Sequence, residues 1–109
     1  MTRITRAVAI EGHGLNALFD TGSVRNFVLR EAAEKAPRIK VKPYTVGIGG
    51  KTMIVHEECI VRGQIEGLEF AMKAIPIDDI RTVDGREVGA IIRTTAMEDW
   101  EIRIDMAKA

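Results

Sequence analysis

Apolar and polar residues alternate along most of the chain, with the two-residue period of half-buried β-strands. The alternation runs through residues 4–10, is interrupted by glycines at 12 and 14, and resumes over 15–19. This pattern predicts a β-hairpin whose second strand ends at Asp20.

Short turn signals separate the remaining predicted strands. These strands cover residues 39–48, 51–55, 59–65, 68–75, 88–92 and 101–105. Gly49-Gly50 and Glu66-Gly67 mark hairpin turns, because glycine adopts a positive φ at little cost. Pro43 has no backbone N–H, which indicates that the strand over 39–48 lies at a sheet edge. The chain is therefore predicted to be mainly β.

Two segments depart from the strand pattern and predict short helices. Residues 29–36 are rich in helix formers and are followed by Pro37, which predicts about two helical turns. Thr95 and Glu98 have the spacing of a capping box, which predicts that a helical turn begins at Thr95. Trp100 then anchors this turn on the sheet.

Composition narrows the possible classes of protein. The 109 residues match one domain, predicted to span 1–109, and 46% apolar content argues against disorder. Acidic and basic residues number 16 each without a basic cluster, which argues against nucleic-acid binding. No apolar run is long enough to cross a membrane. Cys59 is the only cysteine, so no internal disulfide forms; we expect a small buried residue and a reducing compartment such as the cytoplasm.

The candidate chemistry lies in Asp20-Thr21-Gly22-Ser23, between the predicted strand over 15–19 and the apolar pair Phe27-Val28. Asp and Gly are common turn residues, so the tetrapeptide alone is compatible with an ordinary polar turn. The apolar strand before the tetrapeptide and the apolar residues after it favour a functional loop over an ordinary turn.

With these flanks, residues 17–28 resemble the active-site loop of retropepsin-type aspartic proteases. The order of later features is also similar to that family. Residues 46–51 stand where the family has its glycine-rich flap hairpin. Ala90-Ile91-Ile92, the predicted helix over 95–100 and the strand over 101–105 stand where it has an apolar pair, a C-terminal helix and a final strand. The resemblance implies a retropepsin-like closed β-barrel with a flap hairpin and one or two short helices.

The resemblance also implies an aspartic endopeptidase that cleaves polypeptides without a metal or other cofactor. Two carboxylates about 3 Å apart cannot both ionise, so they share one proton and activate a water molecule. Since the chain has one copy of the motif, the second Asp20 must come from another subunit of a C2 homodimer. The alternative is a catalytically silent dimer that binds peptides or serves assembly, and a third possibility is an unrelated barrel with a chance motif.

Roles of the neighbouring residues follow from the same resemblance. Thr21 would reach the partner loop, the Gly22 N–H would donate to Asp20, and the Ser23 hydroxyl could bond Asp20 and favour its ionised form. In the flap, Gly47, Ile48, Gly49 and Gly50 would close over the substrate, although a Gly-Gly hairpin is also a common structural turn. The candidate pocket walls are Val46, Ile48 and Ile92, residue types that more often belong to the core than to a pocket.

Arg93 is the main departure from the family pattern, which has glycine after the apolar pair. A buried guanidinium requires an acidic partner, and Asp79, Asp84, Glu98 and Asp99 are the candidates. Otherwise Arg93 is a solvated strand-end residue. If instead it perturbs the loop, activity would be weak or lost. His13 and His56 lack the spacing of metal ligands, and no metal is expected.

Overall fold

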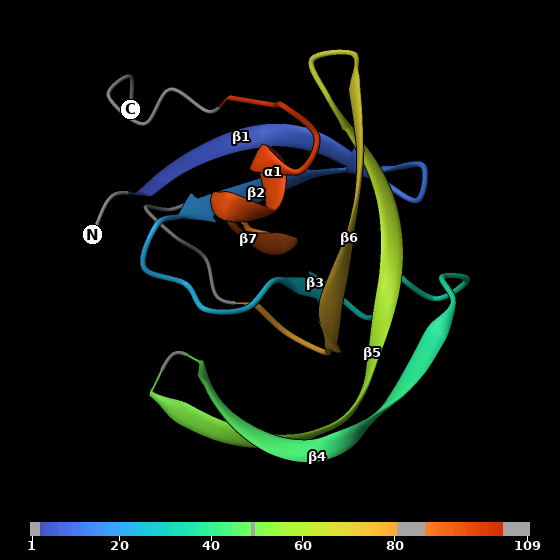
Figure 1. Ribbon diagram of the computed structural model, residues 1–109, viewed down its shortest axis with the longest axis vertical. Coiled ribbons are helices and arrows are strands. Elements are labelled where there is room, and N and C mark those ends of the chain that lie inside the picture. The colour runs from blue at the N-terminus through green and yellow to red at the C-terminus, as the bar shows by residue number, and fades with distance from the viewer. Residues whose placement is uncertain (1–2, 49, 81–86, 104–109) are drawn as a thin grey trace.

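The structure is a computed structural model that describes residues 3–48, 50–80 and 87–103 of the chain. Nearly all of its regular structure is β, as predicted (Figure 1). The strands are β1 (Arg3–Ile10), β2 (His13–Asp20), β3 (Phe27–Leu29), β4 (Arg38–Ile48), β5 (Lys51–Ile65), β6 (Leu68–Ile77) and β7 (Ala90–Arg93). The helix α1 spans Thr95–Glu98.

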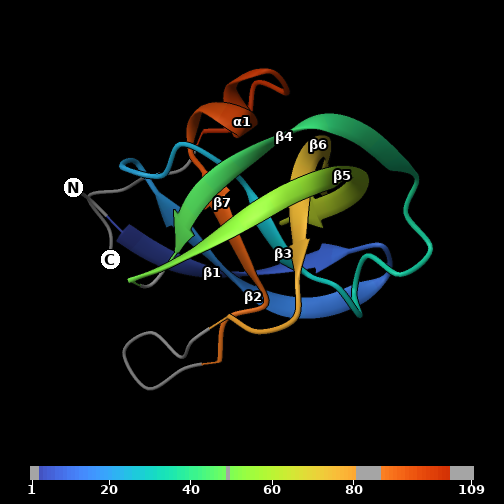
Figure 2. The same cartoon turned by 90° about the horizontal axis from the view of Figure 1, so that it is seen from below.

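The described strands form one sheet that closes on itself. Its order is β1-β2-β7-β3-β6-β5-β4, and a further pairing of β1 with β5 completes a ring. The closure is short, with Ala9 opposite Gln64 and Ile10 opposite Gly63. The hairpin of β4 and β5 extends beyond the ring and curves across one side of it (Figures 1 and 2). The predicted closed barrel with an edge strand containing Pro43 is confirmed.

Two Glu-Gly turns set the register of the long hairpins. Glu11 and Gly12 have φ values of 50° and 82°, and Glu66 and Gly67 have values of 49° and 81°. Consecutive positive φ values fit two-residue turns that follow the twist of the strands they join. The predicted turn at 66–67 is confirmed, and the first hairpin turns at 11–12, so β2 begins at His13.

Two clusters of buried side chains fill the interior. The larger lies inside the ring and includes Phe19, Val61, Ile92, Met97 and Cys59, whose predicted burial is confirmed. The smaller cluster lies where the β4–β5 hairpin faces the ring. Its buried members are Leu18, Phe27, Val46, Val55, Ile75, Ile77, Ile80 and Val88. Because this cluster joins the hairpin to β2 and β3, it fixes the hairpin relative to the end of β2.

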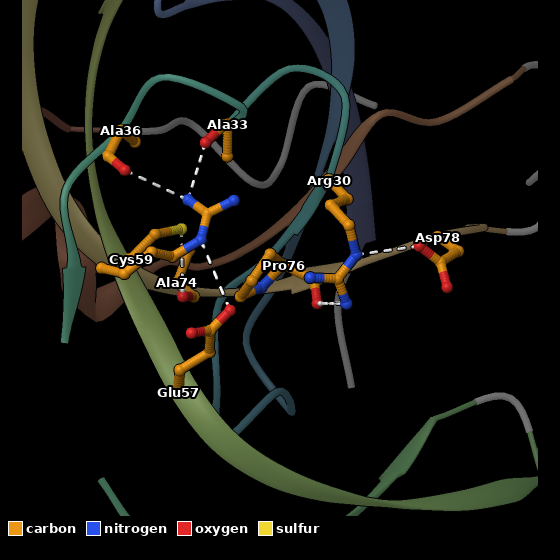
Figure 3. A network of polar contacts seen from close by, with 9 residues as sticks. Arg30, Ala33, Ala36, Glu57, Cys59, Ala74, Pro76 and Asp78 are labelled. Atoms are coloured by element: carbon orange, nitrogen blue, oxygen red, sulfur yellow. Dashed lines mark hydrogen bonds and ion pairs between the residues drawn. The ribbon is translucent and has the colours of Figure 1, made fainter. Parts of the chain in front are cut away.

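The helix predicted over residues 29–36 is wrong. Leu29 belongs to β3, and successive turns follow it. Arg30 donates to the Pro76 carbonyl and to Asp78, while Arg38 donates to the carbonyls of Ala33 and Ala36 (Figure 3). Side-chain bonds to the sheet and to turn carbonyls thus override the helix propensity of the segment.

Other boundaries differ in detail. The predicted strands 51–55 and 59–65 are one continuous strand, β5. A helical turn does begin at Thr95, but the N-cap is Thr94 and it makes no side-chain capping bond. Trp100 is half exposed and donates from Nε1 to the Ala71 carbonyl at 2.9 Å, which joins the segment after α1 to β6. Residues 101–103 are not a strand, and 104–105 lie outside the described residues.

Candidate active site

Asp20 is the last residue of β2, and its side chain is 13% exposed. The Gly22 N–H donates to Oδ1 of Asp20 at 2.8 Å, as predicted, and the Ser23 N–H approaches the Asp20 carbonyl at 3.3 Å. The loop therefore turns back on its own carboxylate. Because charge-assisted bonds of this kind are strong, they fix the orientation of the carboxylate.

Arg3 provides a contact that the sequence analysis missed. Its Nε lies 3.7 Å from Oδ2 of Asp20, and Arg3 is opposite Asp20 in the antiparallel pairing of β1 and β2. A turn at Glu11-Gly12 sets this pairing, so the hairpin register is the signal that could have found it. The two Asp20 oxygens thus have different partners, Arg3 at one and Gly22 at the other.

The expected bond from Ser23 to Asp20 is absent among the described contacts. The Ser23 hydroxyl donates instead to the Arg25 carbonyl at 2.6 Å. A hydroxyl has one proton to donate, and here the loop's own backbone accepts it. Ser23 therefore stabilises the turn that leaves Asp20, not the carboxylate itself.

Asn26 connects this loop to two strands and is the second residue that the sequence analysis missed. Its Oδ1 accepts from the Arg93 N–H at 2.9 Å, and its Nδ2 donates to the Lys73 carbonyl at 2.9 Å. Its own carbonyl accepts from the Ile75 N–H at 2.8 Å. One side chain thus holds the loop to both β7 and β6.

Arg93 lies at the end of β7, opposite Asp20 in the parallel pairing of β2 and β7. Its guanidinium is exposed, and it donates to Thr95 Oγ1 at 2.8 Å and to the Val24 carbonyl at 3.3 Å. Among the described ion pairs none joins Arg93 to an acidic residue. The prediction of a solvated strand-end residue is confirmed, and the guanidinium also braces the loop beyond Ser23.

A cleft of about 850 Å³ separates the Asp20 loop from the β4–β5 hairpin. The loop contributes Asp20, Gly22, Ser23, Val24 and Arg25 to its walls, and the hairpin contributes Thr45, Val46, Gly47, Ile48 and Lys51. Val46 and Ile48 line it as predicted. Ile92 does not: it is fully buried in the ring, and the neighbouring Ile91 points to the cleft because side chains alternate along β7.

The paired strands β4 and β5 lead up to the predicted Gly49-Gly50 turn. Ile48 pairs with Lys51, and Gly50 has a φ of 80°. Gly49 lies outside the described residues. Strand pairing therefore continues to the two residues that flank the predicted Gly-Gly turn, and both strands contribute residues to the cleft.

Arg25 links the loop to β4 of this hairpin. Its guanidinium carbon lies 4.5 Å from the centre of the Tyr44 ring, a cation–π distance. The Tyr44 hydroxyl donates to Glu58 at 2.6 Å, and Glu58 is only 8% exposed. Burial and then the bond to the Glu58 carboxylate raise the pKa of Tyr44 to about 12, so the phenol keeps its proton at neutral pH.

Two features are absent from the described residues. No group of three His, Cys, Asp or Glu side chains is arranged to hold a metal ion within those residues. In that same part of the chain, no helix has the length and apolar character needed to cross a membrane.

Comparison with solved structures finds retroviral proteases. The EIAV protease in complex with the inhibitor HBY-793 has a TM-score of 0.63 and 18% identity, covering 94% of this chain and 92% of that one. The protease of simian foamy virus (mac), solved in solution, has a TM-score of 0.59 and 10% identity, covering 94% of this chain and 100% of that one. Sequence comparison finds no family model and no curated protein that matches. The fold of this chain is retropepsin-like.

Proposed function

We propose that this chain is one half of a homodimeric aspartic endopeptidase, with residues 1–109 forming the protease domain and Asp20 supplying its catalytic carboxylate. One observation carries the proposal. In a retropepsin-like fold, the Asp20 carboxylate is oriented by the Gly22 N–H at the edge of a cleft that a β-hairpin faces from the other side.

The catalytic step follows from the pairing of two Asp20 side chains. One carboxylate accepts a proton from a water molecule held between them, and the water oxygen attacks the carbonyl carbon of the peptide bond. The protonated partner carboxyl donates its proton to the carbonyl oxygen. Transfer of a proton to the amide nitrogen then lets the C–N bond break. No cofactor takes part in these steps.

The dimer is required because the chain has a single Asp-Thr-Gly segment. The loop is suited to an interface: Val24, two residues beyond Gly22, is 74% exposed although it is apolar. Thr21 is also exposed, and we assign its hydroxyl to a contact with the loop of the partner. In a C2 arrangement the same residues meet their own copies across the axis.

We assign the β4–β5 hairpin as the flap that closes over an extended polypeptide. Gly47 and Ile48 line the cleft, and together with Gly49 and Gly50 they form the segment expected to contact the substrate backbone. Peptides held in this way bind through main-chain hydrogen bonds, and pockets receive alternate side chains. We infer a reducing location such as the cytoplasm from Cys59, which is a buried free thiol.

The test is cleavage of an unfolded protein substrate from acid to neutral pH, with and without a pepstatin-like inhibitor. We expect cleavage by the wild type, inhibition, and loss of cleavage in Asp20→Asn. The matched control is Asp79→Asn, a second carboxylate at the cleft that the mechanism does not use. Sedimentation at micromolar concentration should give a dimer. Cleavage that persists in Asp20→Asn, or a strict monomer that cleaves, rejects Asp20 as half of the dyad.

A second candidate, a silent peptide-binding dimer, is favoured by the arginines near Asp20. Arg3 is ion-paired with the carboxylate, and Arg93 occupies the position opposite Asp20 on β7. In this alternative the dimer binds extended peptides but does not cleave them at any pH. Peptide binding without cleavage in both wild type and Arg3→Gln would select it over the protease.

A further inference from the structure

Cationic side chains outnumber carboxylates in the lining of the cleft. Arg3, Arg25 and Lys51 face it, against Asp20 and Asp79. Arg3 is ion-paired with Asp20. Among the described residues, neither Arg25 nor Lys51 has a carboxylate within ion-pair distance. Asp79 also lines one neighbouring hollow, and Arg25 also lines another, on the side of Glu58, so both residues lie at the boundary of the cleft.

Arg25 is the better placed of the two cations. The Tyr44 ring lies against its guanidinium, and the Tyr44 hydroxyl is itself held by the buried Glu58. Contact with a ring uses none of the guanidinium N–H donors. The backbone is fixed as well, because the Arg25 carbonyl accepts the Ser23 hydroxyl bond. The result is an oriented cation at the boundary of the cleft, and its N–H groups have no acceptor among the described residues.

We infer that the cleft selects extended peptides with an acidic side chain, and that Arg25 receives the carboxylate of that side chain. The inference rests on the proposed binding of peptides in this cleft, and not on their cleavage. A guanidinium binds a carboxylate through two parallel hydrogen bonds, which favours Glu or Asp over the neutral amides of the same shape. Lys51, on the opposite side at the flap, adds to the positive potential.

The proposed dimer sharpens this expectation. A C2 axis through the dyad places two Arg25 side chains at equivalent distances from it. The acidic preference is therefore expected at two substrate positions, one on each side of the central peptide bond. A single preferred acidic position in the dimer would contradict this symmetric assignment.

A purely structural role of Arg25 has to be distinguished from the selection of acidic peptides. The contact with Tyr44 could serve only to join the loop to the hairpin. In that case loss of Arg25 weakens all peptides equally, because the cleft itself is disturbed. Selection instead changes the ratio of affinities for acidic and amide peptides. The ratio is therefore the quantity to measure.

The experiment measures binding by fluorescence anisotropy, in the Asp20→Asn protein so that peptides stay intact. The probes are labelled eight-residue peptides of Ala, Leu and Phe in which one Glu, or one Gln in the matched peptide, is scanned through all positions. We expect the best Glu peptide to bind about fivefold more tightly than its Gln match at low salt. Added salt should reduce this preference, because both charges are exposed.

Variants then test whether Arg25 causes the preference for Glu peptides. Arg25→Gln should abolish it, and Arg25→Glu should reverse it toward peptides that carry Lys. The matched control Lys40→Gln removes an exposed cation from β4, the strand that carries Tyr44, outside the cleft lining, and this variant should retain the preference. The inference is overturned if Glu and Gln peptides bind equally, if the preference survives Arg25→Gln, or if no peptide binds at all. If the preference for Glu peptides is found but the wild type cleaves no substrate, the inference about Arg25 is supported and only the proposed protease activity is rejected.

Discussion

The Asn26 side chain bonds the backbone N–H of Arg93 at 2.9 Å, although 67 residues separate the two in sequence. The same amide bonds the Lys73 carbonyl. Asn26 thus holds the end of the Asp20 loop between β7 and β6. We regard it as the residue that positions this loop, a role that β-strand pairing alone does not provide.

The first prediction concerns this amide. Asn26→Ala leaves the Arg93 N–H and the Lys73 carbonyl without their partner, so we expect a loss of about 1–3 kcal/mol in unfolding free energy. Urea unfolding measures it. In the active dimer we also expect kcat to fall more than KM changes, because the loop carries Asp20.

Asn16→Ala is the control for that substitution. Asn16 donates one side-chain bond, to the Glu87 carbonyl at 3.2 Å, and does not line the cleft. We expect a smaller loss of stability and an unchanged kcat. If Asn26→Ala were as stable and as active as Asn16→Ala, the positioning role would be wrong.

The second prediction tests the closure of the sheet at Gly63. A Cβ at this position would lie 2.8 Å from the Ala9 carbonyl oxygen and 2.5 Å from Cζ of Phe70. The Ala9 atom belongs to the backbone that pairs with β5, so it cannot move without disturbing the closure. We expect Gly63→Ala to reduce the unfolding free energy by about 1–3 kcal/mol.

Gly14→Ala is the matched substitution in another strand. A Cβ there meets nothing within 4 Å, and the position has no positive φ. We expect thermal unfolding of Gly14→Ala to stay close to wild type or to rise slightly, because alanine reduces the freedom of the unfolded chain. Equal melting temperatures for the two variants would contradict the account of the closure.

The sequence allowed the hairpins to be predicted because their signals are local. Alternation and a Glu-Gly or Gly-Gly turn determine both strands of a hairpin together. The helix over 29–36 was wrong because bonds from Arg30 and Arg38 to distant or turn backbone outweigh local propensity. Ile92 stayed a candidate for either the cleft or the core, because the sequence does not reveal which face of β7 is turned inward.

Within the candidate site, Asp20 and Gly22 could be identified because they lie in one short motif. Asn26 could not, because its partners come from strands that approach it only in the folded chain. Arg93 was recognised as a departure, but its bonds to Thr95 and Val24 depend on how the loop curves. Sequence therefore indicated the chemistry, whereas the positioning contacts required the fold.

The third prediction concerns the Cys59 thiol. It is fully buried, donates to the Ala74 carbonyl at 3.3 Å, and has a pKa raised chiefly by burial. Since the thiolate is the reactive form, we expect a thiol reagent to label Cys59 only as fast as the protein opens. The control is Lys35→Cys in a Cys59→Ala background, which should react at the rate of a small peptide. Rapid labelling of native Cys59 would contradict this burial.

The last prediction uses the single tyrosine of the chain as a probe of the contact between loop and hairpin. The pKa of Tyr44 is about 12, raised first by burial and then by its bond to Glu58, while the charge of Arg25 acts in the opposite direction. An unfolded tyrosine ionises near pH ~10. The folded state therefore holds this proton more tightly, and the resulting stabilisation is complete below about pH 10 and lost as the pH rises toward 12.

Near-ultraviolet absorbance of the phenolate measures this titration directly, with circular dichroism recorded at each pH to establish that the protein remains folded. Glu58→Gln removes the carboxylate, so the pKa of Tyr44 should fall but stay above its ordinary value because burial remains. Arg25→Gln removes the opposing charge, so the pKa should rise. Glu69→Gln, on the exposed part of β6, should change nothing. A titration that is the same in wild type, Glu58→Gln and Arg25→Gln would show that the three side chains are not coupled, and the oriented Arg25 would lose its support.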